Sequence, residues 1–357
     1  MFPVIHALRE IEGIEALVCV TAQHREMLDQ VLALAGIAPD IDLDVMQQGQ
    51  SLDDLTARIL TGLGRAFDAL QPDVVLVQGD TTTAMAATLA AHYRRIPVAH
   101  IEAGLRSGDL HHPWPEEANR RMIACVAALH FAPTEQARQA LLAEGREPAT
   151  IHVTGNTVID ALLWTRDRAR AEPALASAIG PVIARCEGRR IVAVTSHRRE
   201  NFGDGVAAIG GAILDIAERE DVDIIFPVHP NPNVGGPMRA LLSGAANIHL
   251  VDPLDYPAFV ALLDASHLVL TDSGGVQEEA PGLGKPVLVM RETTERPEGI
   301  EAGTAILVSA DRQRIRTAVT MLLDDEQAHA RMARAHNPYG DGHAARRIAQ
   351  IIAGMGH

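Results

Sequence analysis

The sequence predicts an α/β protein built from two doubly wound, parallel-sheet domains, and three observations carry that prediction. The chain has 357 residues, which is long for one compact core and comfortable for two domains. Apolar residues make up 47% and aromatic residues only 3%, a composition typical of helices packed on aliphatic strands. Short β-branched runs alternate with longer helical patterns, which indicates repeated β-turn-α units with right-handed crossovers.

Each predicted strand is a short apolar run that ends in polar or glycine-containing turn residues. Helical periodicity follows several of them, as in residues 51–70 and 81–93. The predicted strands are 16–21, 74–78, 98–101, 130–132, 151–154, 191–195, 224–228, 248–250, 268–271, 287–290 and 305–308.

The series of units divides near Gly155–Asn156 and resumes at Arg190, after an Ala-, Arg- and Pro-containing stretch over 169–187. We therefore expect one domain over 1–155 and a second after it, with the active site in a cleft between them. Ligands of parallel sheets bind at the carboxyl ends of the strands, so functional residues are sought there. The chain opens in helical phase from Phe2, and no strand precedes that segment.

Charge and cysteine content exclude several classes of protein. The net charge is −15, from 31 basic and 46 acidic residues without a basic run, which argues against a nucleic-acid partner. Cys19, Cys125 and Cys186 are odd in number and far apart, as expected in a reducing cytoplasm. The apolar runs are too short for a membrane span, and no signal-peptide pattern is visible, so no membrane association is expected.

Three carboxylates follow successive strands of the first predicted domain. Asp80 comes after strand 74–78 and either caps the next helix or serves the reaction. Glu102 follows strand 98–101, where it is either an ion-pair partner of Arg106 or a catalytic acid. Glu116 opens a helix, where a solvated first-turn acid is the ordinary interpretation. Together they offer an acid and a base for moving a proton at carbon.

The second predicted domain offers cationic and hydrogen-bonding turns. His197 and Arg198 follow strand 191–195, and His229 follows strand 224–228. A metal shared by His197 and His229 is conceivable, but their spacing is not that of a metal site, and no metal is predicted.

The clearest phosphate signal is Ser273-Gly274-Gly275 between strand 268–271 and a helix. Glycines let backbone N–H groups approach phosphate oxygens, and a helix N-terminus favours negative charge; the alternative is a plain glycine turn. Glu279, about one turn further, is placed to accept hydrogen bonds from a ribose. A polar segment around Arg296 follows the next strand.

These segments, taken in order, resemble the bacterial non-hydrolysing UDP-N-acetylglucosamine 2-epimerases from about Pro3 to about Ile351. The matching motifs are Gly79-Asp80-Thr81-Thr82-Thr83, His100-Ile101-Glu102-Ala103-Gly104-Leu105-Arg106, Pro115-Glu116-Glu117-Ala118-Asn119-Arg120, His197-Arg198-Arg199-Glu200-Asn201, Thr271-Asp272-Ser273-Gly274-Gly275-Val276-Gln277-Glu278-Glu279-Ala280-Pro281, Thr293-Thr294-Glu295-Arg296-Pro297-Glu298-Gly299 and Asn337-Pro338-Tyr339-Gly340-Asp341-Gly342.

The resemblance implies a glycosyltransferase-B-like fold of two Rossmann-like domains. The C-terminal helix, 346–357, is expected to return to the first domain, 1–155, and the UDP-binding domain is expected over 156–345. The family implies a cytoplasmic homodimer that supplies precursors for cell-surface polysaccharide. It interconverts UDP-GlcNAc and UDP-ManNAc without a cofactor, by eliminating UDP to a bound 2-acetamidoglucal and adding it back.

The family's site residues carry over by motif. Asp80, Glu102 and Glu116 are the acid–base carboxylates, and His197 contacts the diphosphate. The expected substrate-binding residues are Ser273, Gly274 and Gly275 for phosphate, Glu279 for ribose, Arg296 near the sugar–phosphate, Phe259 for uridine, and His229 and Arg198 for a second, activating UDP-GlcNAc.

One departure leads to a further expectation. Family members open with a strand and a Gly-Thr-Arg-Pro-Glu loop before a helix that resembles residues 3–8. The first strand of domain one and its phosphate loop are therefore expected to be missing. The competing interpretations are an epimerase of another UDP-sugar, a hydrolysing variant that releases ManNAc, and a degenerate nucleotide-sugar-binding protein.

Overall fold

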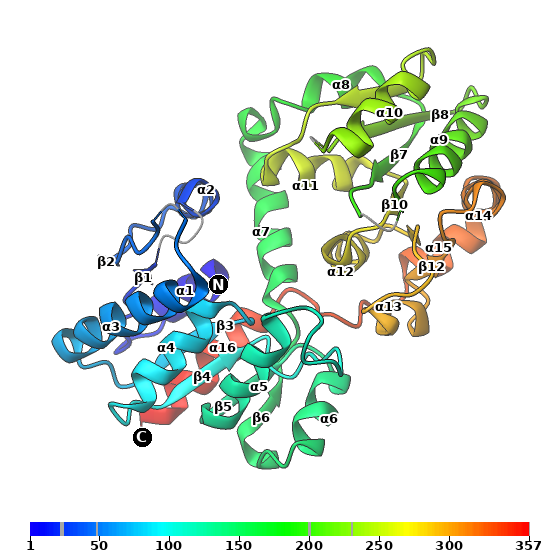
Figure 1. The fold of residues 1–357 in the computed structure, drawn as a ribbon. Helices are drawn as coiled ribbons and strands as arrows, with labels where there is room; N and C mark the ends of the chain where they lie inside the picture. Colours follow the sequence, from blue (N-terminus) through cyan, green and yellow to red (C-terminus); the bar gives the residue numbers. More distant parts are fainter. Residues whose placement is uncertain (22–24, 48, 199–200, 230, 357) are drawn as a thin grey trace. The chain divides into compact units, whose positions relative to one another are not determined.

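The computed structural model describes residues 1–21, 25–47, 49–198, 201–229 and 231–356. The chain divides into two units (Figure 1). Unit 1 comprises Met1–Asp160 and Tyr339–His357, and unit 2 comprises Ala161–Pro338. Each unit is an α/β fold around parallel strands and is described by itself.

Unit 1 holds a parallel sheet in the order β3-β4-β5-β6 and a separate parallel pair, β1-β2. The strands are β1 Cys19–Val20, β2 Ile41–Asp42, β3 Val75–Gln78, β4 Val98–Ile101, β5 Leu129–Ala132 and β6 Ile151–Val153. The helices are α1 Phe2–Arg9, α2 Arg25–Ala35, α3 Leu52–Leu70, α4 Thr82–His92, α5 Glu116–Val126, α6 Glu135–Ala143 and α16 Ala344–Ala353, with short 3₁₀ turns at Pro148–Thr150 and Gly354–Gly356.

The four-stranded sheet of unit 1 buries both faces, because successive side chains of a strand point to opposite sides. Val98 of β4 joins a core with α3 and α4, whereas Ala99 and Ile101 join one with α1 and α16. Helix α3 begins at a capping box in which Ser51 and Asp54 satisfy each other's backbone N–H groups.

The expectation of a missing first strand is not confirmed. It rested on the resemblance to a family that opens with a strand before a helix like residues 3–8, and a lost strand would leave apolar faces open to solvent. Instead, α1 packs against α16, a segment far away in the sequence (Figure 1). Val4 and Leu8 are 0% and 6% exposed, in one apolar cluster with Ile348. The apolar face of α1 is therefore covered by the core of unit 1.

Unit 2 contains a six-stranded parallel sheet in the order β12-β11-β10-β7-β8-β9. The strands are β7 Arg190–Thr195, β8 Val222–Pro227, β9 Ile248–Val251, β10 Leu268–Thr271, β11 Val287–Val289 and β12 Ala305–Leu307. The helices are α8 Gly180–Arg185, α9 Asp204–Ala217, α10 Pro232–Leu242, α11 Tyr256–Ala265, α12 Gly274–Gly282, α13 Pro297–Glu301, α14 Arg312–Asp324 and α15 Glu326–Ala333, with a 3₁₀ turn at Pro173–Ala176. Helix α7, Thr157–Ala171, runs across the division between the two units.

The same alternation builds the core of unit 2. Val192 and Val194 of β7 pack with α9, α10 and α14 on one face of the sheet, and Ala193 packs with α8, α11 and α12 on the other. The fold prediction of doubly wound parallel sheets is confirmed, and two strands, β4 and β10, begin and end where the sequence placed them. No helix among the described residues is long and apolar enough to cross a bilayer.

Candidate active site

Asp80 and Glu102 emerge from neighbouring strands of unit 1. β3 and β4 are in parallel register, with Gln78 opposite Ile101, so both acids lie just beyond the carboxyl edge of the sheet. The two loops lie close together, since Glu102 Oε2 is 3.7 Å from the place where a methyl group on the Gly79 Cα would stand. The structure therefore brings these two predicted residues together.

Glu102 has a positive φ of 63°, in the left-handed region. Side chains other than glycine adopt this conformation uncommonly, and they keep it only where the surrounding structure holds them in place. The backbone on both sides is fixed by the sheet, since Gly79 N donates to Ile101 O and Ala103 N donates to Phe131 O, each over 3.0 Å.

The helix-cap interpretation of Asp80 is wrong. The N-cap of α4 is Thr81, whose hydroxyl accepts from the Ala84 N–H at 3.3 Å. Asp80 instead forms an ion pair with Arg120, and its backbone carbonyl accepts from Asn119 Nδ2 at 2.8 Å. Its carboxylate is 22% exposed, so it is held in position while still reachable from solvent.

Glu116 is the first residue of α5 and half-buried. It precedes Asn119 and Arg120 by one helical turn, and these two residues hold Asp80, so the start of α5 lies against the end of β3. Its neighbour Glu117 is fully buried and accepts from Ser107 N and from Arg121 Nε, both at 3.0 Å. Of these two first-turn acids, Glu117 is committed to structure and Glu116 is partly open to solvent.

The alternative of an ion pair between Glu102 and Arg106 is not supported. The Arg106 guanidinium makes a bidentate contact with Glu144, at 2.7 and 2.8 Å. Such a fork-to-fork pair engages both carboxylate oxygens of Glu144. Arg106 therefore anchors the loop after β4 to α6.

His100 of β4 fixes the loop that carries Asp80 at the carboxyl edge of the sheet. Its side chain is fully buried, and Nε2 donates to the Gly79 carbonyl over 2.8 Å. Burial lowers the pKa of His100 to about 4, so the ring is neutral at pH 7 and its one N–H is used on Gly79. The residue before Asp80 is thereby fixed by a neutral donor.

In unit 2, Asp272 organises the turns that follow β7 and β10. It is fully buried and accepts from Ser196 Oγ, Asn201 Nδ2 and the backbone N–H groups of His197 and Arg198, over 3.0–3.1 Å. Burial alone would raise the pKa of Asp272, but the hydrogen bonds from His197 and Arg198 outweigh it and hold the pKa below the usual value.

The anion donors predicted in unit 2 surround the start of α12. His197 Nδ1 lies 3.2 Å from Asp272 Oδ1, which leaves Nε2 as the ring nitrogen for a ligand. Helix α12 begins at Gly274 after Ser273, whose side chain makes no capping hydrogen bond. A methyl group on Gly274 would lie 3.8 Å from Arg198 NH2, so the guanidinium lies beside this helix start. An anion there meets the helix dipole and a cation together.

Glu279 is buried on α12 and accepts from Tyr256 Oη at 2.8 Å. Burial raises the pKa of Glu279 to about 7, with Glu278 adding to the rise and the Tyr256 hydrogen bond opposing it. Phe259 is half-buried on α11, one turn after Tyr256, so the two rings share a helix face.

Arg296 reaches the same helix from the loop after β11. It forms an ion pair with Glu278, and its backbone N–H donates to Thr294 Oγ1 at 3.0 Å. Thr294 in turn donates to Gln277 Oε1 over 2.6 Å, which ties the loop to α12. Arg296 therefore lies beside α12, the helix that carries Glu279.

His229 lies near the same turns, because its ring stacks on His197 at a centroid distance of 5.9 Å. Arg199, Glu200 and Pro230, which belong to the quoted motifs and turns, lie outside the described residues.

Sequence reasoning missed the supporting roles of Asp272, Tyr256, Arg120 and His100. Three of them stand inside the quoted motifs, which was a usable signal. Tyr256 had no local signal, since its contact with Glu279 spans 23 positions of the chain.

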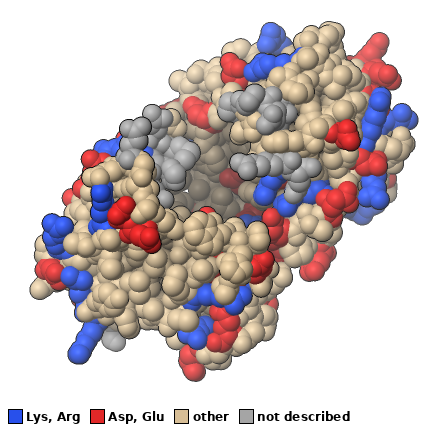
Figure 2. Space-filling view, viewed as in Figure 1, with Lys and Arg blue, Asp and Glu red and all other residues tan. Residues whose placement is uncertain are grey.

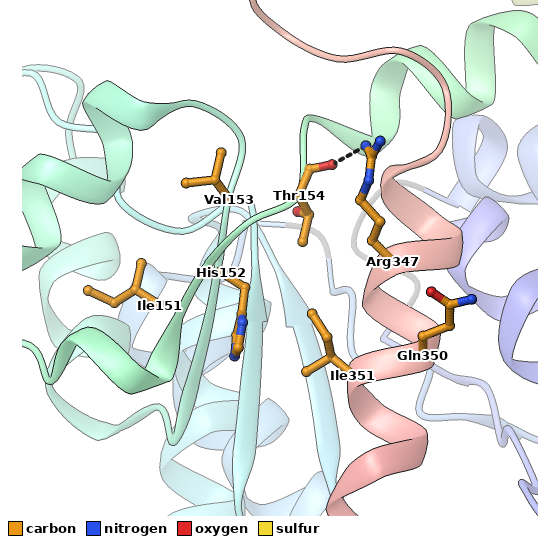
Figure 3. A pocket seen from close by; sticks show the side chains of 7 residues that line it. All are labelled: Ile151, His152, Val153, Thr154, Arg347, Gln350 and Ile351. Carbon is orange, nitrogen blue, oxygen red and sulfur yellow. Dashed lines mark hydrogen bonds between the residues drawn. The ribbon is translucent and has the colours of Figure 1, made fainter.

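A separate hollow of about 500 Å³ lies between β6 and α16 of unit 1 (Figure 3). Arg347 crosses it and donates to the Thr154 carbonyl over 3.1 Å. None of the predicted site residues lines this hollow. Over the face shown in Figure 2, acidic and basic side chains are interspersed, so no broad basic field is seen there.

Each of the two α/β units contains a parallel sheet. One unit carries carboxylates at its strand ends and the other an anion-binding helix start, and this combination defines a glycosyltransferase-B-like nucleotide-sugar enzyme. Residues 6–353 match the family model described as UDP-N-acetylglucosamine 2-epimerase.

Relatives support the same assignment along the whole chain. A probable UDP-N-acetylglucosamine 2-epimerase of Ralstonia solanacearum is 56% identical, over 99% of this chain and 94% of the relative. The UDP-N-acetylglucosamine 2-epimerase of Escherichia coli K12 is 54% identical with the same coverage. The crystal structure of the Neisseria meningitidis enzyme bound to UDP-GlcNAc is 46% identical, covers 99% of this chain and 96% of its own, and has a TM-score of 0.87. The chain belongs to the UDP-N-acetylglucosamine 2-epimerase family, whose members are isomerases.

Proposed function

We propose that this chain interconverts UDP-GlcNAc and UDP-ManNAc. The observation that carries the proposal is the trio Asp80, Glu102 and Glu116 at one sheet edge of a chain that matches 2-epimerases along its whole length. Epimerisation at C2 requires a proton to leave one face and return to the other, and carboxylates near the sugar can do both.

The proposed reaction breaks and forms the same bonds in reverse order. A carboxylate takes the C2 proton as the C1–O bond breaks, UDP leaves with the bonding electrons, and a C1=C2 double bond remains in a bound glucal. An acid then protonates C2 from the opposite face, and the UDP oxygen re-forms the bond to C1. Asp80, Glu102 and Glu116 are the candidates for these proton transfers, and exclusion of water protects the glucal from hydrolysis.

The leaving diphosphate carries negative charge that the enzyme must stabilise. We assign this role to His197 together with Ser273, Gly274 and Gly275 at the start of α12. Asp272 supports the assignment, since it holds His197 Nδ1 and turns the other ring nitrogen toward a ligand.

The remaining nucleotide contacts are proposals as well. Glu279 binds the ribose, Phe259 packs on the uracil and Arg296 lies near the sugar–phosphate. Arg198 and His229 lie beside His197, where they suit a second, activating UDP-GlcNAc. The domain limits stay a prediction: 1–155 with 346–357, and 156–345.

We infer that the enzyme works in the cytoplasm as a homodimer and supplies precursors for cell-surface polysaccharide. Its three cysteines are free, as suits a reducing compartment.

Proton NMR of UDP-GlcNAc with the enzyme in deuterated water tests the proposal. We expect UDP-ManNAc to form and C2 of both epimers to gain deuterium. Epimer formation with the C2 hydrogen fully retained would exclude the proton-transfer mechanism. Stoichiometric free ManNAc and UDP would instead identify the hydrolysing variant.

A further inference from the structure

A second cluster of reactive side chains lies in unit 2, away from the nucleotide-binding turns. It consists of Cys186, Asp223 and His249, whose ligand atoms lie within 4.8 Å of one another. Asp223 is near the start of β8, whereas Asp272 follows the end of the parallel strand β10. The cluster is therefore at the sheet edge opposite to the anion-binding turns.

The three residues come from three separate elements that the fold holds rigidly. Cys186 ends α8, and Asp223 and His249 stand on the paired strands β8 and β9. The side chain of Asp223 is fully buried, the thiol residue is 1% exposed and the His249 side chain is 15% exposed. His249 Nε2 lies 2.7 Å from Asp223 Oδ1, so the ring and the carboxylate already face each other.

The second observation is the state of the other carboxylate oxygen. Asp223 Oδ2 is buried and accepts no well-aligned hydrogen bond, although Arg189 Nε lies 2.6 Å away. The Arg189 side chain is 39% exposed, so it covers the carboxylate from the solvent side. Arg189 therefore fixes the orientation of the carboxylate through Oδ2 and leaves Oδ1 facing the His249 ring.

The neighbouring thiol is kept protonated by this setting. Burial, and after it the Asp223 charge, raises the pKa of Cys186 to about 11. Its Sγ lies 3.2 Å from the Val182 carbonyl. A thiol, an imidazole and a carboxylate that converge from rigid elements are the donor set of tetrahedral zinc.

We propose that Cys186, Asp223 and His249 form a zinc-binding site. The thiolate sulfur, His249 Nε2 and Asp223 Oδ1 supply three ligands, and a water completes the tetrahedron. Binding releases the thiol proton to solvent and replaces the direct contact between His249 and Asp223. Arg189 keeps its contact with Asp223 Oδ2 and orients the carboxylate, as outer-shell partners do in zinc sites. The metal joins α8 to β8 and to the edge strand β9, and takes no part in epimerisation.

Cobalt(II) serves as the spectroscopic probe, because a thiolate ligand and tetrahedral geometry both give it distinctive absorbance. The full chain is freed of metal by chelation and titrated with Co²⁺ and then with Zn²⁺. We expect one Co²⁺ per chain, with a thiolate charge-transfer band, and its displacement by Zn²⁺. Cys186→Ser should abolish the band and weaken Zn²⁺ binding by at least about 100-fold, more than the loss of an outer-shell partner.

The double variant Cys19→Ser/Cys125→Ser is the matched control, because it leaves Cys186 as the only thiol and alters none of the proposed ligands. Its band must persist. Loss of the band in this double variant, no band in the starting protein, or a band that survives Cys186→Ser would each overturn the proposal. The band in the double variant decides the matter even where Cys186→Ser fails to fold. Epimerase activity is not the readout, so failure of the zinc site leaves the proposed reaction untouched.

Discussion

The two units use the same architecture to present opposite chemistry. Each ends parallel strands at one sheet edge, yet unit 1 presents acids there and unit 2 presents donors to an anion. The contrast is sharpest between Asp80 and Asp272, which follow the carboxyl ends of β3 and β10 in their respective sheets. Asp80 is partly exposed and paired with Arg120, whereas Asp272 is fully buried and accepts hydrogen bonds from four neighbouring donors.

The comparison teaches that strand position alone does not decide the role of an acid. The turn that follows differs between the units: Glu102 stands in the left-handed region beside Gly79, whereas Asp272 is followed by Ser-Gly-Gly at the start of α12, where a helix N-terminus offers backbone N–H groups to an anion. Unit 1 should therefore govern proton transfer, and unit 2 nucleotide binding and the departure of UDP.

The largest expected effect is a loss of turnover caused by substitutions in unit 1 alone. Asp80→Asn, Glu102→Gln and Glu116→Gln should each lower turnover by roughly 10²–10⁴-fold, because each removes a candidate proton-transfer group. UDP affinity should change little, since the nucleotide contacts are assigned to unit 2. Epimerisation rates by NMR and calorimetry with UDP measure the two quantities.

Glu135→Gln is the control for this series, because Glu135 is an exposed acid of the same unit on α6. It should behave as the unchanged enzyme does. Normal turnover in all three site variants would return those acids to a structural role.

The next prediction concerns the free energy of unfolding, whose dependence on pH should have opposite signs for one buried group in each unit. His100 has a folded-state pKa of about 4 against 6.5 unfolded, so its contribution to stability is present above pH 6.5 and lost as pH falls toward 4. Glu279 has a pKa of about 7 against 4.5 unfolded, so it destabilises increasingly as pH rises from 4.5 to 7. Each effect is on the order of 3 kcal/mol.

Denaturant unfolding of His100→Gln and Glu279→Gln across pH 4–8 checks these signs. Relative to the unchanged chain, His100→Gln should gain stability toward acid and Glu279→Gln should gain it toward neutral pH. If the stability of both variants, relative to the unchanged chain, changed in the same direction with pH, the opposite pKa shifts of His100 and Glu279 would be contradicted.

A smaller effect probes unit 2. Gly274→Ala and Gly275→Ala should weaken UDP binding by about tenfold, or ~1.4 kcal/mol, because a methyl group blocks the close approach of phosphate. Stability should not suffer, since the added methyl meets only Arg198 at 3.8 Å in one case and open space in the other.

Gly236→Ala is the matched control, as its added methyl also meets open space within a helix. Unchanged UDP affinity in both α12 variants would mean that phosphate does not bind at this helix start.

The smallest effect concerns how Tyr256 tunes Glu279. UDP affinity should rise by a few-fold as pH rises through about 7, since the ionised carboxylate accepts ribose hydroxyls better. Tyr256→Phe removes the hydrogen bond that lowers the pKa of Glu279, so the midpoint should move to higher pH. Calorimetry between pH 6 and 9 measures it, with Glu279→Gln expected to be flat.

Much of the fold could be predicted because its signals are local. Strands β4 and β10 lie between turn residues and were predicted at their observed limits. The pair β1–β2 was predicted less well: strand 16–21 shortens to Cys19–Val20, and Ile41–Asp42 was missed, because two residues carry no periodicity.

The site was harder to predict where partners are distant or residue types are ambiguous. Asp80 and Thr81 are both good helix caps, and only the structure shows that Thr81 fills the position. Arg106 has its partner 38 positions away at Glu144, which no local pattern reveals. Composition and motif order thus predicted where the acids lie. The tertiary contacts decide which of them are engaged in structural ion pairs and hydrogen bonds.

Helix α16 sets an order of events during protein synthesis. Ile348 and Ile352 of this helix belong to the same core as Val4 and Leu8, yet they leave the ribosome after every residue of unit 2. The nascent chain can therefore assemble the nucleotide-binding half while the half with the carboxylates still lacks a wall of its core. During that interval the apolar faces of α1 and β4 are open to chaperones. A translation stop or a protease cut just before Ala344 would leave a chain with its anion-binding turns complete and its proton-transfer half unfinished.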